Sequence, residues 1–317
     1  MLVNPLLQPR TFTAAELAGG LNRTIHRIKG TQAPDVNNGQ PVTAGLTLGA
    51  FDAIILLADH IAAPSTTRPY IQPNGVISAD AFGAFPSTAP GSRIEIYGSN
   101  LSATTRAWSG ADFSGSSAPT SLDGVSVTVG GRPTYVAYIS PGQVNAVVPS
   151  DAPLGQVGVV VSGPAGVSDA YIVMVEALRP GLLAPPSFQA SGKQYAAALF
   201  PDGQTFVLPS GAIPGVPSRP AKPGETIILY GIGFGPVTPN VPAGTLVGQL
   251  NSLSNPFQMF FGSTAATLAY YGLAPNLTGL YQFNVVVPNV ADSATVPLTF
   301  SLAGQGGTQT LYIAVQR

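Results

Sequence analysis

Two phrases recur in similar form along this chain, and their spacing is the feature that most constrains the fold. Residues 141–149 read PGQVNAVVP and residues 280–288 read LYQFNVVVP, while residues 90–98 read PGSRIEIYG and residues 223–231 read PGETIILYG. The Pro-Gly pair recurs 133 positions later, from 90 to 223, and the Gln-x-Asn pair 139 positions later, from 143 to 282. Solenoid and propeller units are only about 20 to 50 residues long. The longer spacing therefore predicts a duplicated domain in which each copy buries its own core.

The residues between these phrases favour strands. The chain contains 37 Gly and 31 Pro, which separate short runs rich in Val, Ile, Tyr and Thr. Turn signals every 8 to 12 residues or so are typical of a β-sandwich. We therefore predict an all-β protein, with strands at 93–97, 125–129, 134–139, 144–148, 156–162 and 170–175 in the first copy and at 226–230, 257–261, 266–271, 281–287, 294–302 and 309–315 in the second.

Composition excludes several classes of partner. The net charge is −1 and only 9% of the residues are charged, so the chain lacks the clustered Lys and Arg that bind nucleic acid or an anionic membrane. It has no apolar run of about 18 residues for a membrane helix, and no Cys for disulfides or thiolate sites. The sparse charge predicts an extracellular or cell-surface protein. The first seven residues do not resemble a signal peptide, so we expect such a signal, if the protein is exported, to be missing from this chain.

We predict five segments. Residues 1–58 form a partial β unit with strands near 24–28, 41–48 and 53–57, and residues 59–89, rich in Pro, Ser and Thr, form a linker. The first sandwich spans 90–177 and the second spans 223–317.

Residues 178–222 are expected to be a second linker that contains a β-hairpin. Apolar runs flank Pro201, Asp202 and Gly203, and Asp-Gly is a common hairpin turn. We expect this hairpin to lie against the second sandwich and to stiffen the junction.

Several segments resemble known families. The phrases at 90–98 and 223–231 are similar to the first strand of IPT/TIG immunoglobulin-like domains, in which a Gly closes the strand; here these are Gly98 and Gly231. Residues 27–39 and 51–57 resemble the last strands of the β-domain that follows the catalytic barrel in some bacterial glycoside hydrolases. A further set of segments resembles a C-terminal module of soil acidobacteria of the Solibacter type, at 99–102, 105–108, 119–127, 138–145, 219–226, 230–236 and 279–285.

These resemblances imply a fold and a context. They imply two tandem immunoglobulin-like β-sandwiches, preceded by a small partial β-sheet unit, at the end of a secreted multidomain protein whose upstream part is a glycosidase. They imply no catalytic residue.

Two aromatic residues are candidates for ligand binding. Trp108, the only Trp, lies with Phe113 in a Gly- and Ser-rich insertion at 103–118. Exposed rings on a loop could stack on a sugar. The alternative, which we favour, is that Trp108 pins the long loop onto the edge of the sandwich. For the tyrosines of the strands we favour packing in the core or between sheets.

Four amide residues recur as a structural motif. Gln143 and Asn145 share one face of their strand, as do Gln282 and Asn284, because side chains alternate with a period of two. We expect them to bond backbone groups of a neighbouring loop. An ion-binding role is the alternative.

Catalytic chemistry has little support in the sequence. The only two histidines are His26 and His60, and the 14 carboxylates are scattered singly. A triad or a zinc site needs more ligands that converge. The Gly-rich run at 231–235 precedes Pro236 rather than a helix, so it does not form a phosphate loop. We expect no catalytic, cofactor or metal-binding residue.

The resulting interpretation is a non-catalytic extracellular region that spaces or attaches an upstream glycosidase-like module. We expect its partner to be a polysaccharide or a component of the cell envelope. The alternative is a carbohydrate-binding accessory module that uses loop aromatics, and glycoside hydrolysis by this chain itself is the least favoured reading.

Overall fold

The chain divides into two compact units, Met1–Ser65 and Thr66–Arg317, in a computed structural model. The structure describes residues 2–3, 8–13, 24–27, 46–48, 53–57 and 68–317. No helix among these residues is long and apolar enough to cross a membrane.

Unit 1 is built from short antiparallel strands. One sheet has the order β1-β5-β3, and β2 pairs with β4 in a second sheet. The strands are β1 (Leu2–Val3), β2 (Arg10–Phe12), β3 (Thr24–Arg27), β4 (Leu46–Leu48) and β5 (Ala53–Leu57). Thus β3, β4 and β5 form where strands were predicted. The rest of the run predicted at 41–48 lies outside the described residues.

The first sandwich of unit 2 has two facing sheets. The order is β6-β8-β14-β13-β9 in one and β10-β11-β15-β17-β7 in the other, with short β12 and β16 on the latter. The strands are β6 (Tyr70–Ser78), β7 (Ser87–Thr88), β8 (Arg93–Ser99), β9 (Arg106–Ala107), β10 (Ser121–Leu122), β11 (Val125–Val129), β12 (Arg132–Pro133), β13 (Tyr135–Ile139), β14 (Gln143–Val147), β15 (Gly155–Gly163), β16 (Gly166–Val167) and β17 (Tyr171–Val175).

Strand alternation builds the first core. On β11 the side chains of Val125, Val127 and Val129 are buried, while those of Ser126 and Thr128 face outward. The first residues of β8 and β14 alternate in the same way, since successive side chains of a strand point to opposite faces. Burying a Val or Ile side chain contributes roughly 1.5–3 kcal/mol, so each buried valine of these strands stabilises the first sandwich.

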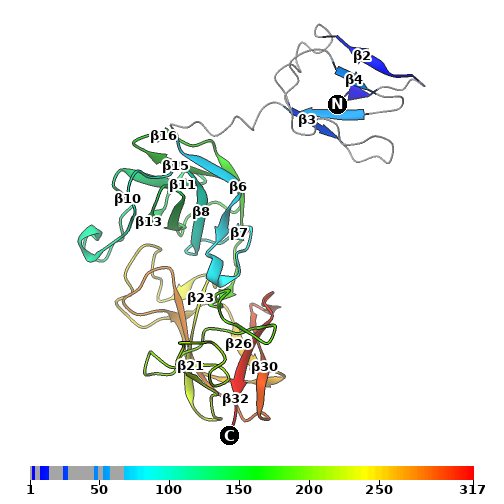
Figure 1. Ribbon diagram of the computed structural model, residues 1–317. Helices are drawn as coiled ribbons and strands as arrows, with labels where there is room; N and C mark the ends of the chain where they lie inside the picture. The colour runs from blue at the N-terminus through cyan, green and yellow to red at the C-terminus, as the bar shows by residue number, and fades with distance from the viewer. Residues whose placement is uncertain (1, 4–7, 14–23, 28–45, 49–52, 58–67) are drawn as a thin grey trace. The chain divides into compact units, whose positions relative to one another are not determined.

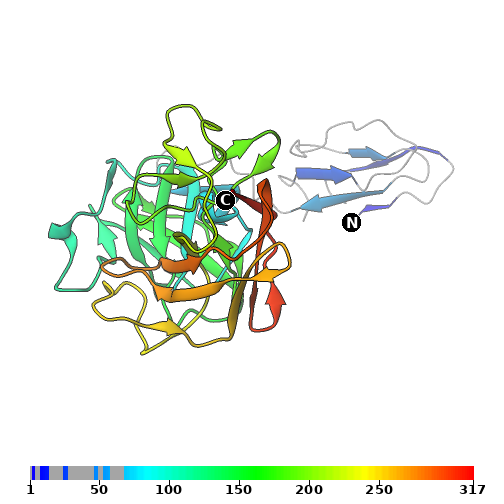
Figure 2. The same cartoon turned by 90° about the horizontal axis from the view of Figure 1, so that it is seen from below.

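The second sandwich repeats this plan. Its sheets have the orders β18-β23-β29-β28 and β27-β26-β30-β31, and β32 pairs with β30 on the same edge as β31. The strands are β18 (Gly181–Leu182), β23 (Thr226–Ile232), β26 (Phe257–Phe261), β27 (Thr264–Ala265), β28 (Thr267–Leu273), β29 (Tyr281–Val286), β30 (Ser293–Leu302), β31 (Gln305–Gly306) and β32 (Leu311–Val315). Figure 1 shows the first sandwich in cyan to green and the second in green to red. In Figure 2, turned by 90°, red β32 and orange β30 belong to this second sandwich.

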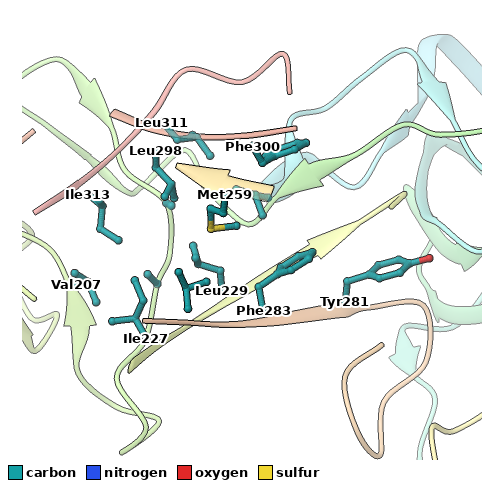
Figure 3. Close-up of a cluster of buried hydrophobic side chains, with 14 of the residues drawn as sticks. Val207, Ile227, Leu229, Met259, Tyr281, Phe283, Leu298, Phe300, Leu311 and Ile313 are labelled. Atoms are coloured by element: carbon teal, nitrogen blue, oxygen red, sulfur yellow. The ribbon is translucent and has the colours of Figure 1, made fainter. Parts of the chain in front are cut away.

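The second core is richer in aromatic residues. Phe234 packs against Phe257, Phe283 and Phe300 with ring centroids 4.7–5.6 Å apart. Around them lie the aliphatic side chains and Met259 that Figure 3 shows. Phe234 belongs to the Gly-rich run at 231–235. That run leaves β23 as a loop and inserts this ring into the core, which confirms the absence of a helix after it.

All twelve strands predicted for the two copies are present, with ends shifted by two residues at most. The fold class is confirmed: the protein is all-β, with immunoglobulin-like sandwiches, and its buried residues form separate clusters in the two copies. The predicted linkers, however, are not linkers throughout. Residues 70–78 lie inside the range 59–89 but form the nine-residue strand β6.

Each expected linker supplies the edge strand of the sandwich that follows it. Ile71 pairs with Gly98, and Leu182 pairs with Gly231, the same position of the repeat. Leu199 forms a bridge with Ile228 of β23, as Ile77 pairs with Glu95. The repeat therefore begins before residues 90 and 223. These edges were missed because Pro73, Asn74 and Gly75 interrupt the apolar alternation of β6, while β18 is only two residues long.

The second edge contains an insertion between Leu182 and Leu199. It includes the small hairpin of β19 (Gln189–Ala190) and β20 (Lys193–Gln194), and Ala196 N donates to Tyr312 O of β32 at 3.1 Å. The predicted Pro201-Asp202-Gly203 turn forms, with Gly203 N donating to Phe200 O at 3.0 Å. The following segment pairs β21 (Phe206–Val207) with β22 (Ser218–Arg219). Residues 178–222 thus join the second core, and their Leu182, Ala198, Phe200, Val207 and Ala221 are buried in it.

A continuous interface joins the two sandwiches. The loop at 109–118, which contains the 3-10 turn η2 (Gly110–Asp112), reaches the second sandwich through a bridge between Ser117 and Thr245. Ala118 N donates to Gly244 O at 2.7 Å, and Leu246 N donates to Ser116 O at 2.8 Å. Backbone pairing therefore crosses from one sandwich to the other.

Further contacts extend this interface. Arg93 donates to Thr278 O at 2.7 Å, and Ala243 N donates to Ser150 Oγ at 2.7 Å. At the turn η1 (Asp80–Phe82), Phe82 packs on Ile232 of the second sandwich. The remaining short strands are β24 (Val237–Thr238) and β25 (Ser252–Leu253), which pair beside the loop that carries Gly244.

Candidate functional site

The outer face of one sheet in the first sandwich carries polar and aromatic side chains. Along β14, Val144 and Ala146 are buried, whereas Gln143 and Asn145 are half-buried on the opposite face. Gln143 Nε2 donates a hydrogen bond to Asn145 Oδ1 at 2.8 Å. This bond leaves Gln143 Oε1 as an acceptor and Asn145 Nδ2 as a donor without a protein partner among the described residues.

Strand β8 places a second polar pair beside this one. Tyr97 lies opposite Gln143 and Glu95 lies opposite Asn145. Tyr97 Oη donates to Glu95 Oε2 at 2.6 Å. Burial, followed by this bond to the carboxylate, raises the pKa of Tyr97 well above its ordinary value. The phenol therefore stays protonated and holds the carboxylate in place.

The second sandwich repeats the arrangement without the charge. Gln282 Nε2 donates to Asn284 Oδ1 at 2.8 Å. Tyr230 lies opposite Gln282, but Ile228 occupies the position that Glu95 has in the first copy. The second face therefore keeps the amide pair and lacks the carboxylate.

A bulge adds a tyrosine to both faces. The register shifts between Val136 and Tyr138 on β13 and between Leu268 and Tyr270 on β28. After the shift, Tyr138 lies opposite Asn145, as Tyr270 lies opposite its counterpart in β29. Bulges re-aim side chains in this way.

Two expectations are corrected by these contacts. The amide side chains bond each other rather than the backbone of a neighbouring loop, because residues two apart on a strand share a face and lie within reach. The tyrosines expected in the core are half-buried on the outer faces: Tyr97, Tyr135, Tyr138, Tyr230 and Tyr270. Tyr271 packs against the second core, and Tyr281 is buried in it.

Gly98 and Gly231 allow a close approach of the edge strands. A Cβ on Gly98 would lie 1.8 Å from the carbonyl oxygen of Tyr70 in β6. At Gly231 it would lie 2.4 Å from the ring of Phe234 and 3.0 Å from Gly181 O. A side chain at either position would therefore collide with the edge strand or with the loop that follows, which was not predicted from the sequence.

Trp108 and Phe113 form an aromatic pair on the insertion loop. Their ring centroids are 5.2 Å apart and the planes are inclined by 63°. Trp108 is half-buried and packs against the first core, and its backbone N–H donates to Ala137 O at 2.9 Å. This geometry agrees with pinning of the loop. The two inclined rings do not form a coplanar strip, so ligand binding by this pair stays a prediction.

Charged groups hold the base of the same loop. Arg106 makes two hydrogen bonds of 3.0 Å to Asp112 and one of 2.9 Å to Asp123. Ser109 N donates to Asp112 Oδ2 at 2.7 Å. The Arg106 bonds, with those from Ser109, lower the pKa of Asp112 to about 2. The pKa of Asp123 is also lowered, mainly by the hydrogen bond from the Thr104 hydroxyl and next by the bond from Arg106.

The acidic residues of this network are thus used structurally. Among the described residues, no three His, Cys, Asp or Glu side chains gather as they would around a metal ion. His26 lies in β3, where only the backbone is described, and His60 lies outside the described residues.

Glu95, whose carboxylate lies beside the amide pair, is not among the site residues predicted from the sequence. A sequence signal for Glu95 does exist. Glu95 and Tyr97 are two residues apart within the repeated phrase 90–98, as Gln143 and Asn145 are within 141–149. The contact residues between the sandwiches, among them Arg93, Tyr135 and Gly244, have no sequence signal of this kind.

Comparisons with known proteins bear on the first sandwich. The IPT/TIG domain model matches residues 83–171. That domain is a non-catalytic immunoglobulin-like fold. The match confirms the resemblance for this part of the chain. The acidobacterial resemblance stays a prediction. A search of the curated proteins finds no match.

Solved structures give only weak likenesses. The chain aligns over 98% of its length with 64% of the SGBP-B protein of the Bacteroides ovatus mixed-linkage glucan utilization locus, in complex with a mixed-linkage heptasaccharide, at 11% identity and a TM-score of 0.36. It aligns over 83% with 19% of the plexin A4 extracellular region, at 14% identity and a TM-score of 0.26. It aligns over 99% with 36% of the γ-CGTase of alkalophilic Bacillus clarkii, at 13% identity and a TM-score of 0.26. The chain spans less than two thirds of each protein, and similarity this weak supports no inference about function.

Proposed function

We propose that this chain is a non-catalytic structural and adhesive region of a secreted multidomain protein, which spaces or attaches an upstream glycosidase-like module outside the cell. The observation that carries the proposal is the continuous interface between the sandwiches. Domains within one chain move relative to each other by default unless their interface is extensive. Here backbone pairing through Ser117 and Thr245, and the bond from Arg93 to Thr278 O, tie the two sandwiches into one body.

Rigidity can be measured directly because the chain has no native Cys. Spin labels on Gln156→Cys and Gln258→Cys, exposed positions of β15 and β26, report the distance between the sandwiches. We expect a single narrow distribution by double electron–electron resonance. A broad distribution would contradict the spacer function.

The non-catalytic and adhesive parts have their own tests. Incubation with soluble polysaccharides should release no reducing ends. The same protein should be retained on an isolated bacterial cell-envelope fraction. Release of reducing sugar, or absence of retention, would contradict the corresponding part of the proposal.

A second candidate function, a carbohydrate-binding accessory, is favoured by the outer face of the first sandwich. Gln143 Oε1, Asn145 Nδ2 and the carboxylate of Glu95 offer acceptors and a donor on neighbouring strands. Tyr97 and Tyr138 supply rings beside them. Such a mixture of polar groups and rings suits the hydroxyls and the apolar faces of a sugar.

Affinity electrophoresis in gels that contain soluble polysaccharides tests this candidate. Wild type is compared with Asn145→Ala on the sheet face, Trp108→Ala on the loop, and Thr128→Ala on the opposite sheet as a control. Retardation that is lost only in Asn145→Ala supports the sheet face, and loss only in Trp108→Ala supports the loop. No retardation of wild type on any polysaccharide would remove the candidate.

A further inference from the structure

A cavity of about 390 Å³ lies between the two sandwiches. The first sandwich lines it with the turn at Pro90 and the loop at 150–154. The second lines it with the loop that follows β23 and with the beginning of β29. Its volume falls within the roughly 300–1,000 Å³ of small-molecule sites.

The floor of the cavity is apolar. Ala152, Val237, Leu273 and Tyr281 line it and are all buried. In Figure 3, Tyr281 lies at the end of the second core, with its hydroxyl directed away from the other labelled side chains. That hydroxyl donates to Gly235 O, and burial raises the pKa of Tyr281 above its ordinary value. The hydroxyl of Tyr281 is therefore un-ionised and already hydrogen-bonded, so the aromatic ring is the part of this residue that a ligand would contact.

The rim adds one exposed apolar side chain and a few neutral polar groups. Leu154 stands at the rim with 60% of its surface exposed. Ser150 Oγ accepts the N–H of Ala243 at 2.7 Å, so its own proton is available to a ligand. Asn240 is exposed and its side chain makes no hydrogen bond within the described part of the chain.

We propose that this cavity binds an uncharged, mostly apolar small molecule that carries one or two hydrogen-bonding groups. None of the residues that line it is charged. An ionic ligand would lose hydration there without gaining a counter-charge, which is strongly unfavourable. An apolar ligand would cover Leu154 and the floor, and its polar group would meet Ser150 or Asn240.

The proposal goes beyond the spacer function and is independent of it, because rigidity does not require a ligand. A bound ligand would nevertheless contact both sandwiches. A ligand that binds only the folded protein stabilises it, and the stabilisation grows with the logarithm of the ligand concentration divided by the dissociation constant.

Fluorescence titration with Nile red, an uncharged apolar dye, tests the proposal. We expect saturable binding of one dye per chain, with a blue-shifted emission. The anionic dye 1-anilinonaphthalene-8-sulfonate should bind at least about tenfold more weakly. Leu154→Ser and Ala177→Glu, both at exposed rim positions that should not affect folding, should each weaken Nile red binding at least about fivefold.

Ile172→Ser is the matched control, because Ile172 is 58% exposed on β17 and does not line the cavity. It should leave the affinity unchanged. Absence of saturable binding to wild type would overturn the proposal. So would equal affinities for wild type and both rim variants, or binding of the anionic dye as tight as that of Nile red.

Discussion

At the scale of single residues, the contact between Gly244 and Tyr135 shows how closely the sandwiches approach. Gly244 has a φ of +74°, and a Cβ there would lie 2.3 Å from ring atoms of Tyr135. The ring of one sandwich thus packs on the bare backbone of the other. Only glycine meets both the conformational and the steric requirement at this position.

Gly244→Ala should therefore lower stability. The backbone strain alone costs about 1–3 kcal/mol, and the clash adds displacement of the Tyr135 ring. Gly248→Ala is the control in the same loop, because a Cβ there would have no neighbour within 4 Å. Thermal unfolding followed by circular dichroism measures both. Equal melting temperatures of the two variants would show that the interface tolerates a side chain at 244.

The Asp112 carboxyl makes the insertion loop sensitive to acid. Its pKa is about 2 in the folded protein, against 3.8 ordinarily. Because the pKa of Asp112 is lower in the folded protein, its carboxylate stabilises the loop fully when the pH is above the ordinary pKa. This stabilisation is lost as the pH falls through the pKa of the folded state. Trp108, the only Trp, reports on the same loop.

We therefore expect the tryptophan fluorescence to stay constant from pH 7 to about 4 and to change with a midpoint near 2. In Asp112→Asn the low-pH signal should already appear at neutral pH. Asp169→Asn, which removes a surface pair with Arg68, is the control and should behave as wild type. A midpoint near 4 in wild type would contradict the role assigned to Arg106.

At the scale of elements, the local sequence pattern predicts the central strands but not the edge strands. The central strands β11 and β26 have the predicted bounds, because alternation and flanking turns encode them locally. Strand β6 carries the bulge at 72–75 and becomes a strand only by pairing with β8. An edge strand is defined by its neighbour, so its own residues give a weak signal.

A chain that starts at residue 90, the predicted domain boundary, should therefore be less stable than one that starts at residue 68. Removal of β6 exposes the edge of β8 and the apolar side chains beneath Ile71 and Val76, both buried in the first core. We expect a lower melting temperature and self-association by size-exclusion chromatography. Identical behaviour of the two chains would show that β6 is dispensable.

At the scale of the whole molecule, two cores share one interface. Arg93 is central to it: its guanidinium donates to Thr278 O at 2.7 Å and lies 5.9 Å from the Trp108 ring centre. Burial lowers its pKa, and its Nε has no hydrogen-bond partner in the described part of the chain. Removal of this donor leaves a buried carbonyl without its partner.

Calorimetry should show one cooperative unfolding transition for residues 66–317 and two transitions after Arg93→Ala. An unsatisfied buried acceptor costs about 1–3 kcal/mol. Arg132→Ala is the control, since Arg132 forms an exposed pair with Asp151, and such pairs contribute only about 0–1 kcal/mol. Two transitions in wild type would mean that the interface does not couple the sandwiches.

The sequence by itself determined the duplication through its repeated phrases, and the sparse charge through its composition. It also determined the all-β class and the central strands, because alternation and turn residues act over a few positions of the chain. It also indicated the Gln-x-Asn pairs and the aromatic loop as special. Only the tertiary structure decided that those amides bond each other beside Glu95, that the predicted linkers complete the sheets, and that a neutral cavity lies between the sandwiches. These features join residues far apart in the chain, and which surfaces meet depends on shape and hydrogen-bond partners that no local pattern records.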